Sequence, residues 1–344
     1  MNFSTEQLEI INAPLDEKTI VMAAAAAGKT ATLTERIRKV LKNGVSPNRI
    51  VAITFTNNAA AEMKERLGED YKDGLFIGTI HSYANHLLNN NGYNTQRVRD
   101  EEEFDELFSM IEENPEVLKP IDYLLCDESQ DLNSEQFLFV TTVLDPKAML
   151  IVGDVRQSIY SFKGATPERM IGLMANPEFE VRQLTQNYRN GKKILAFSEK
   201  FLKNMKSLKR LRDLKTVEAM RDTEGLVAKL QYYQIPYIIK SKGDYKNWAV
   251  LCRTNQKVGK VCLMLQNYGI PTTSFRQAQG DLSSLKSNLS ADAVKVLTIH
   301  SAKGLEFDRV VVCDLAKYGE ENLRLNYVAT TRARNELYVC ITDK

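Results

Sequence analysis

The chain has 344 residues, which at about 150 residues per domain predicts two domains. Apolar residues make up 43% and charged residues 26%, an ordinary globular balance that can bury a sizeable core. The 46 basic and 44 acidic residues leave a net charge of +2, which excludes a protein that holds nucleic acid by net charge alone. Any contact with a polyanion must therefore come from the local placement of charge.

Short apolar runs, each followed by a polar or glycine-containing turn, recur along the chain. Several lack polar alternation, which is typical of strands buried on both faces of a parallel sheet. Helical patterns lie between them, for example at Ala59–Leu67 and Glu135–Val143. This alternation predicts an α/β architecture. The runs are Thr19–Met22, Ile50–Phe55, Tyr123–Cys126, Met149–Val152, Trp248–Cys252, Val294–Ile299, Arg309–Cys313 and Leu337–Ile341.

The sequence carries no sign of a membrane or export segment. No stretch of about 18 apolar residues is present, so no transmembrane helix is expected. The N-terminal residues carry acids and lack the basic region of a signal or transit peptide. The five cysteines, an odd number without a CxxC pair, favour buried free thiols over disulfides or zinc. We therefore expect a reducing, intracellular location, the cytoplasm.

Two segments are strongly charged. Residues 99–113 hold eight acids and one base, and residues 191–215 hold nine bases and two acids. The acidic segment is interpreted as solvated surface. Two interpretations of the basic segment stay open, a solvated helix face or a surface that contacts phosphates.

A phosphate-binding loop is indicated at Gly28-Lys29-Thr30, between the first apolar run and a helical pattern at Ala31–Leu41. Backbone N–H groups at a helix N-terminus point at phosphates, and the Lys29 ammonium adds positive potential. The Thr30 hydroxyl is expected to ligate Mg²⁺. The first glycine of the usual pattern is replaced by the start of the run Ala23–Ala27. Because alanine is costly where φ is positive, we expect ATP to bind weakly; the alternative is that the backbone of this loop does not need the additional glycines.

A second element of a hydrolysis site follows the apolar run Tyr123–Cys126. Asp127 at the strand end can hold Mg²⁺ opposite Thr30, and Glu128 can polarise the water that attacks the γ-phosphate. The alternative, that the two acids only cap a following helix, is weaker because they come after a phosphate-binding loop.

With these residues in place, the sequence resembles the UvrD/Rep/PcrA family of superfamily 1 DNA helicases over nearly its whole length. Eight motifs, in addition to the loop at 28–30, come in the family's order, which makes chance implausible. They lie at residues 2–7, 52–63, 78–83, 127–130, 151–164, 186–189, 296–307 and 327–333.

The resemblance implies two RecA-like P-loop NTPase lobes, each a mainly parallel sheet flanked by helices. Lobe 1A is expected at residues 1–183 and lobe 2A at 184–344. The family's two accessory domains have little room, since only 44 residues separate Ser82 from Asp127 and 106 separate Arg189 from Val296. We therefore expect domain 2B to be absent and domain 1B to be reduced to the acidic stretch near 89–120. With eleven residues after Ala333, the chain is interpreted as a near-minimal motor.

The resemblance also assigns roles at the ATP site. It implies that Gln7 reads adenine, that Tyr188 stacks on it, and that Glu306 binds the ribose. Arg189 and Arg332 would reach the γ-phosphate, and Gln157 would couple that phosphate to DNA. The complete expectation for ATP and Mg²⁺ is catalysis by Lys29, Asp127, Glu128, Gln157, Arg189 and Arg332, nucleotide contacts from Gln7, Ala27, Gly28, Lys29, Thr30, Ala31, Tyr188 and Glu306, and metal ligation by Thr30 and Asp127.

Single-stranded DNA binding needs aromatic platforms and backbone contacts. Phe162 is the favoured base-stacking residue, since polar residues flank it. For Phe55 and Tyr160, packing in the core is an equally good interpretation. The motif positions expected to contact DNA are Thr54, Phe55, Thr56, His81, Tyr83, Tyr160, Phe162, His300 and Lys303.

These features predict an ATP-dependent 3′→5′ translocase and helicase that acts as a monomer on single-stranded and 3′-tailed duplex DNA. Because unwinding in the family relies on the missing domains, we expect weak unwinding or unwinding stimulated by a protein partner. Two alternatives stay open. One is a DNA-binding regulatory module that hydrolyses little ATP. The other is a motor on RNA: the order of the motifs favours DNA, but no residue here distinguishes the two nucleic acids by the 2′-hydroxyl.

Overall fold

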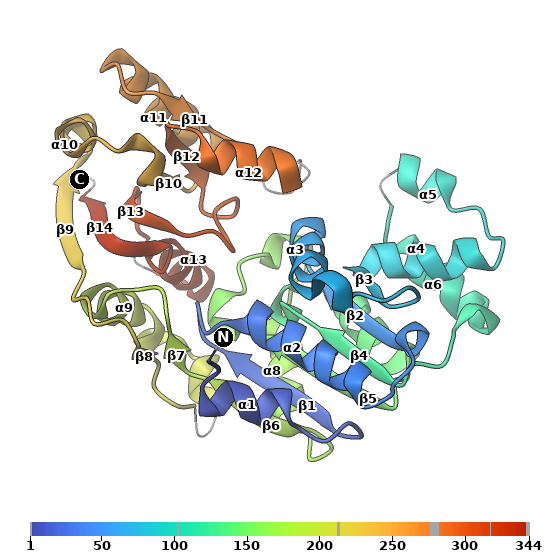
Figure 1. The fold of residues 1–344 in the computed structure, drawn as a ribbon. Coiled ribbons are helices and arrows are strands. Elements are labelled where there is room, and N and C mark those ends of the chain that lie inside the picture. Colours follow the sequence, from blue (N-terminus) through green and yellow to red (C-terminus); the bar gives the residue numbers. More distant parts are fainter. Residues whose placement is uncertain (1, 102, 212–213, 276–281, 317, 342–344) are drawn as a thin grey trace. The chain divides into compact units, whose positions relative to one another are not determined.

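Two parallel sheets organise the chain in the computed structural model (Figure 1). The chain separates into two units, Met1–Thr185 and Gln186–Lys344, which are described in turn. The structure describes residues 2–101, 103–211, 214–275, 282–316 and 318–341.

Unit 1 is built on a six-stranded parallel sheet in the order β3-β2-β4-β5-β1-β6. Residues 20–23 of β1 and all of β2, β4 and β5 are buried, as their continuous apolar runs predict. The strands are β1 (Lys18–Ala23), β2 (Ile50–Thr54), β3 (Phe76–Thr79), β4 (Tyr123–Cys126), β5 (Ala148–Gly153) and β6 (Glu180–Leu184).

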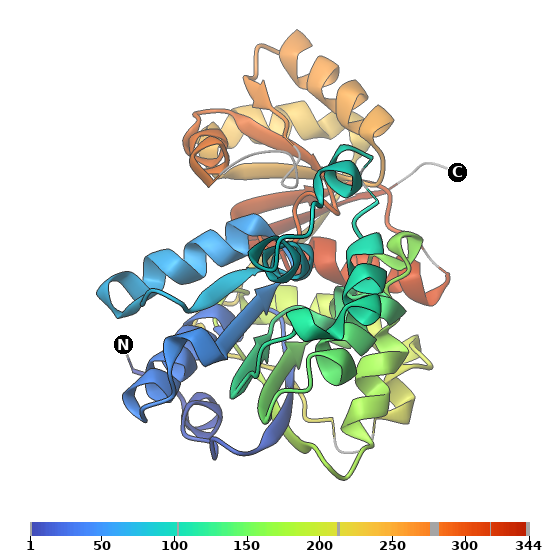
Figure 2. The same cartoon turned by 90° about the vertical axis from the view of Figure 1, so that its right-hand side faces the viewer.

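Helices cover both faces of this sheet, and the side view shows α2 and α3 on one side of the strands and α8 on the other (Figure 2). The expected helix at Glu135–Val143 is a short α-helix continued by a wider π-helical turn at Phe139–Val143. The helices are α1 (Thr5–Ile11), α2 (Lys29–Lys42), α3 (Asn57–Leu67), α4 (Ile80–Asn90), α5 (Gln96–Asp100), α6 (Glu106–Glu113), α7 (Ser134–Leu138) and α8 (Pro167–Met174).

The strand register of unit 1 brings several loops to one edge of the sheet. Cys126 lies opposite both Ile53 and Ile151, and Ile20 lies opposite Ile151 as well. Since all these strands are parallel, the residues that follow β1, β2, β4 and β5 emerge at the same edge, where ligands bind in open α/β sheets.

Unit 2 repeats this plan with a second six-stranded parallel sheet, in the order β11-β12-β10-β13-β14-β9. Its core centres on the buried Trp248, whose ring stacks on Tyr338 at 5.6 Å between ring centres. The strands are β9 (Leu226–Gln231), β10 (Trp248–Cys252), β11 (Thr272–Thr273), β12 (Val294–Thr298), β13 (Phe307–Val312) and β14 (Ala333–Ile341), with a separate pair β7 (Gln186–Asn187) and β8 (Glu218–Ala219).

The helices of unit 2 are α9 (Lys192–Glu199), α10 (Ile235–Lys242), α11 (Asn255–Asn267), α12 (Leu282–Ser290) and α13 (Glu320–Thr330). Together the two units have the α/β fold of two RecA-like lobes, as the sequence predicts. Among the described residues, no helix is long and apolar enough to span a bilayer. All five cysteines are free thiols.

Candidate functional site

The loop between β1 and α2 is tied to the N-terminal helix by Gln7. The Gln7 amide donates a hydrogen bond to the carbonyl of Ala27 at 3.1 Å, and its oxygen accepts one from the Ser4 backbone N–H in a capping box. Gly28 caps α2 with a φ of 75°, and a Cβ there would lie 2.5 Å from the Gln7 side-chain nitrogen. The expected adenine reader and the expected phosphate loop are therefore in direct contact.

The alanine run contains one strained residue. Ala26 has a φ of 58°, the left-handed conformation that glycine adopts at little cost, whereas Ala23 ends β1. The strain expected of alanine in this loop is therefore present at one position, Ala26.

Replacing Ala26 by glycine should therefore raise the free energy of unfolding of unit 1 by about 0.5–1 kcal/mol. The left-handed backbone costs alanine about 1–2 kcal/mol, and the extra freedom of glycine in the unfolded chain offsets about half of that. Urea unfolding followed by circular dichroism measures the change. The matched control is Ala27→Gly, since Ala27 is buried and has no positive φ. This variant should unfold with a free energy about 1 kcal/mol lower than that of the unaltered protein. Equal destabilisation of both variants would contradict strain at Ala26.

At the sheet edge, Lys29 in the first turn of α2 meets the acids that follow β4. Its ammonium donates a hydrogen bond to the Glu128 carboxylate, and both side chains are largely buried. Burial alone would lower the pKa of Lys29, but the charges of Glu128 and Asp127 outweigh it and raise that pKa well above its ordinary value. Lys29 is therefore a cation at every physiological pH.

Glu128 is connected to the next loop by buried hydrogen bonds. The Gln130 amide donates to the Glu128 carboxylate, and the Gln130 side-chain oxygen accepts from the Asp154 backbone N–H at 2.8 Å. The carboxylate of Asp154 accepts hydrogen bonds from Arg156 at 2.6 Å and from Gln157 at 2.7 Å. This series joins the expected catalytic residues Glu128 and Gln157 through side chains that the sequence motifs did not single out.

A glycine is required within this connection. A Cβ on Gly153, the last residue of β5, would lie 2.5 Å from the Gln130 side-chain oxygen and 2.8 Å from the Ser129 hydroxyl oxygen. Gly153 therefore allows the loop after β4 to lie directly against the loop after β5.

The oxygen donors at this edge fit Mg²⁺, the hard cation that ATP carries. Asp127 is buried at the end of β4, and Thr30 lies in the first turn of α2. Among the described residues no group of three or more His, Cys, Asp or Glu side chains is arranged to hold a metal ion.

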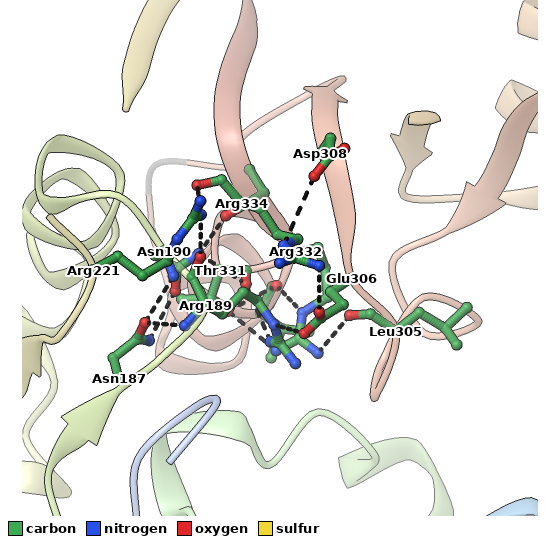
Figure 3. A network of polar contacts seen from close by, with 12 residues as sticks. Asn187, Arg189, Asn190, Arg221, Leu305, Glu306, Asp308, Thr331, Arg332 and Arg334 are labelled. Atoms are coloured by element: carbon green, nitrogen blue, oxygen red, sulfur yellow. Dashed lines mark hydrogen bonds and ion pairs between the residues drawn. The ribbon is translucent and has the colours of Figure 1, made fainter. Parts of the chain in front are cut away.

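In unit 2, three residues expected at the nucleotide form one cluster with the neighbouring Arg334 (Figure 3). They are Arg189, Arg332 and Glu306. The Arg189 guanidinium pairs with the Glu306 carboxylate at 2.7 Å, and Arg334 reaches the same carboxylate at 3.3 Å. Arg332 is buried and donates to the carbonyls of Val328 at 2.9 Å and Leu305 at 3.2 Å. The cluster forms because Phe307 of β13 pairs with Ala333 of β14.

Two buried asparagines order the backbone around Arg189. The side-chain oxygen of Asn187 accepts hydrogen bonds from the backbone N–H groups of Arg189 at 3.0 Å and Asn190 at 2.8 Å. Asn190 in turn donates to the carbonyl of Thr331 at 3.1 Å, and Arg221 donates to the carbonyl of Arg189 at 2.8 Å. The sequence motifs do not predict these supporting hydrogen bonds, and their only signal is an Asn on each side of the Tyr-Arg pair.

The charges of the cluster fix the ionisation of Glu306. Burial would raise the pKa of its carboxyl, but the charges of Arg189, Arg334 and Arg332 and the hydrogen bond from Arg189 lower it below its ordinary value. Glu306 is therefore an anion that can accept hydrogen bonds, as a ribose ligand must. Tyr188, the expected adenine platform, is exposed beside the cluster and donates a hydrogen bond to the Gln186 side-chain oxygen.

Three expected DNA contacts of unit 1 form a row of aromatic rings. Phe55 stacks on Tyr160 at 5.1 Å between ring centres, and Tyr160 lies 5.9 Å from Phe162. Phe162 is 65% exposed, whereas Phe55 and Tyr160 are half-buried. Thr54 and Thr56 hold the loop beside the row, since the Thr54 hydroxyl donates to the Thr56 carbonyl and the Thr56 hydroxyl caps α3.

The two expected contacts on α4 differ in position. His81 is partly exposed, bonds the Asp105 carboxylate at 3.0 Å and stacks on Phe108. Tyr83 was expected at the same surface, but only 4% of it is exposed and its ring packs on Phe76. Residues two apart on a helix face nearly opposite sides, so Tyr83 does not share the surface on which His81 lies. Tyr83 is a core residue in this structure.

The remaining expected contacts, His300 and Lys303, lie in the turn that follows β12 in unit 2. The turn is closed by the Thr298 hydroxyl, which accepts a hydrogen bond from the Ser301 N–H at 3.1 Å, and by the Lys303 N–H, which donates to the His300 carbonyl at 3.2 Å. His300 is half-buried and Lys303 is 8% exposed.

Two families of helicase domains match the chain. The UvrD/REP helicase N-terminal domain matches residues 3–119 and 103–178, and the UvrD-like helicase C-terminal domain matches residues 278–344. A protein of Acanthamoeba polyphaga mimivirus, named as a putative ATP-dependent DNA helicase, is 28% identical over 387 residues, covering 98% of this chain and 53% of that protein.

The ATP-dependent DNA helicase PcrA of Staphylococcus epidermidis and that of Staphylococcus aureus are each 27% identical over 358 residues. These matches cover 74% of this chain and 48% of either relative. The chain spans about half the length of the curated relatives it matches. On both domain matches and on its two RecA-like units, the chain belongs to the UvrD/REP helicase family.

Proposed function

We propose that the chain hydrolyses ATP to move 3′→5′ along single-stranded DNA, and that it unwinds 3′-tailed duplexes weakly or with the help of a protein partner. The observation that carries the proposal is the hydrogen-bonded series from Lys29 through Glu128, Gln130 and Asp154 to Gln157. It gives unit 1 a continuous polar path from a phosphate-binding loop to the segment that presents the exposed Phe162.

For the nucleotide, we propose that residues 27–31 bind the phosphates and that Gln7 and Tyr188 bind adenine. The charged Lys29 and the helix N-terminus favour a polyanion there. Thr30 and Asp127 would hold Mg²⁺, which supplies Lewis-acid stabilisation of phosphate charge when bound.

For the reaction, we propose that Glu128 orients and deprotonates the attacking water. Arg189 and Arg332 would stabilise the charge that develops on the γ-phosphate, with Glu306 binding the ribose. Gln157, which is hydrogen-bonded to Asp154 at 2.7 Å, would couple the state of the phosphate at Glu128 to the aromatic row.

For DNA, we propose that bases stack on Phe162 and, after a small opening of the row, on Phe55 and Tyr160. Stacking is tolerant of sequence, as a translocase requires. Thr56, His81 and His300 would contact the sugar-phosphate backbone. Thr54 and Lys303 were also expected to do so, but they are only 2% and 8% exposed and would support these contacts from beneath. We propose that the chain acts on DNA as a monomer.

The test is ATP turnover with and without single-stranded DNA or RNA, paired with unwinding of duplexes that carry a 3′ or a 5′ tail. We expect strong stimulation by DNA and unwinding only of the 3′-tailed substrate. Preference for a 5′ tail would refute the polarity, and stimulation by RNA alone would identify an RNA motor. The strained Ala26 favours one competing function, a DNA-binding module with little turnover. Tight DNA binding without DNA-stimulated hydrolysis would support that module.

A further inference from the structure

A row of basic side chains in unit 2 is not used by the sites above. Within the basic segment 191–215, Lys200, Lys203, Lys206 and Lys209 recur every three residues, Arg210 follows, and all five are exposed. We call these five residues the basic row. Two short 3₁₀ turns, Leu202–Asn204 and Leu208–Arg210, form part of the segment. Met205, which separates the two turns, is extended and buried, so the row follows an irregular segment rather than one helix.

The row carries charge that the protein does not neutralise. Within the part of the chain that the structure describes, none of its five side chains forms an ion pair with an acid. Lys193 on α9, by contrast, lies 3.8 Å from Glu224. Arg212 and Asp213 of the same segment lie outside the described residues. Five like charges within eleven residues repel one another, so their retention fits an external anion.

The backbone of the row is fixed to helix α13 by a partly buried set of hydrogen bonds around Glu320 and Ser207, which we call the clasp. The Glu320 carboxylate accepts hydrogen bonds from the backbone N–H of Ser207 at 3.1 Å and from its hydroxyl at 2.7 Å, and from the backbone N–H of Lys206. Arg324, one turn further along α13, donates to the Ser207 hydroxyl at 2.9 Å. Met205 and Ser207 are buried while the lysines on either side are exposed.

The clasp determines how the row can act. The nearby carboxylate of Glu320 is used by backbone and hydroxyl donors, so it does not pair with the Lys206 or Lys209 ammonium groups. The segment is therefore held in place while its cations face solvent. A fixed row of ammonium groups suits a repeated anion, such as the phosphates of a nucleic-acid backbone, better than a single small ligand.

We propose that the basic row binds the phosphate backbone of DNA, as a binding surface additional to the aromatic row of unit 1. The inference rests on the proposed function for the identity of the polyanion. Binding of this kind is independent of sequence and sensitive to salt. Helix α13 runs from the clasp to Thr330, and the proposed catalytic Arg332 follows two residues after the helix ends.

The experiment compares two variants with equal charge changes. One replaces Lys200, Lys203, Lys206 and Lys209 by glutamine. The other replaces four exposed lysines elsewhere in unit 2, namely Lys229, Lys240, Lys246 and Lys260. Binding of a labelled single-stranded oligonucleotide and of a 3′-tailed duplex is measured by anisotropy over a range of KCl concentrations, without ATP. Thermal unfolding and DNA-independent ATP turnover check that both variants remain folded.

We expect the row variant to bind about 10–100-fold more weakly at low salt. The slope of log affinity against log salt concentration should fall by about 0.7 for each phosphate of the single strand that is no longer neutralised, so by about 2 to 3 in all. The control variant should stay close to the unaltered protein. A larger decrease on the tailed duplex than on the single strand would place the duplex on the row, and an equal decrease would place the single strand there.

Two results would overturn the proposal while leaving the proposed function intact. In one, the unaltered protein shows DNA-stimulated turnover and the row variant keeps its salt slope. In the other, both variants weaken equally, which would mean that overall charge matters and the row does not. Failure of the proposed function has a different signature, because the unaltered protein would then show no stimulation by DNA.

Discussion

Replacement of Lys29 by alanine should lower DNA-stimulated ATP turnover by about 10³-fold, the order of loss seen when a preorganised electrostatic contact to a transition state is removed. The ammonium is the cation of the proposed phosphate site in the first turn of α2. Its pKa is raised by Glu128 and Asp127, so it is charged throughout the working pH range. Phosphate release with saturating single-stranded DNA measures the decrease.

The same helix supplies a matched control. Lys42 lies exposed in the last turn of α2, and Lys42→Ala should leave turnover within about twofold because surface substitutions of this kind rarely matter. Glu128→Gln should also abolish most turnover, since it removes the proposed base, but it should retain binding of a fluorescent ATP analogue better than Lys29→Ala. If Lys29→Ala hydrolysed ATP at the unaltered rate, the phosphate site would lie elsewhere and the enzyme interpretation would fail.

The fold could be predicted where strands are buried on both faces. The central strands β1, β2, β4 and β5 of unit 1 and β10, β12 and β13 of unit 2 coincide with continuous apolar runs. The strands β3, β6 and β9 were not predicted, and each is an outermost strand of its sheet. An edge strand has neighbours on one side only, so polar residues such as those in Glu180–Leu184 are tolerated and the apolar signal is lost.

The candidate site was likewise predictable only in part. Residues that would touch ATP lie in recognisable motifs, because their chemistry fixes both residue type and spacing. Gln130 and Asp154 hold Glu128 and Gln157 through hydrogen bonds between two loops, and nothing in the local pattern shows that those loops meet. Tyr83 was expected to contact DNA but is buried, because a motif gives the order of residues and not the face of the helix on which each lies.

Replacement of Arg189 by alanine is expected to reduce turnover by about 10²–10³-fold with a smaller effect on DNA binding. A guanidinium that stabilises charge on a transferring phosphoryl group acts mainly in the transition state, so kcat should fall more than KM rises. Arg189→Lys should restore little, because lysine lacks the planar set of donors. Steady-state turnover at varied ATP concentrations separates kcat from KM.

Arg334 provides the control for a role in structure alone. It pairs with the same Glu306 carboxylate, at 3.3 Å, but is 44% exposed and lies at no position with an expected catalytic role. Arg334→Ala should therefore change turnover by less than about threefold. If Arg334→Ala and Arg189→Ala impaired turnover equally, the cluster would act only by orienting Glu306. If only Arg189→Ala did so, the guanidinium would be the group that acts on ATP, and Asn187 would help to position it by accepting a hydrogen bond from the Arg189 backbone N–H.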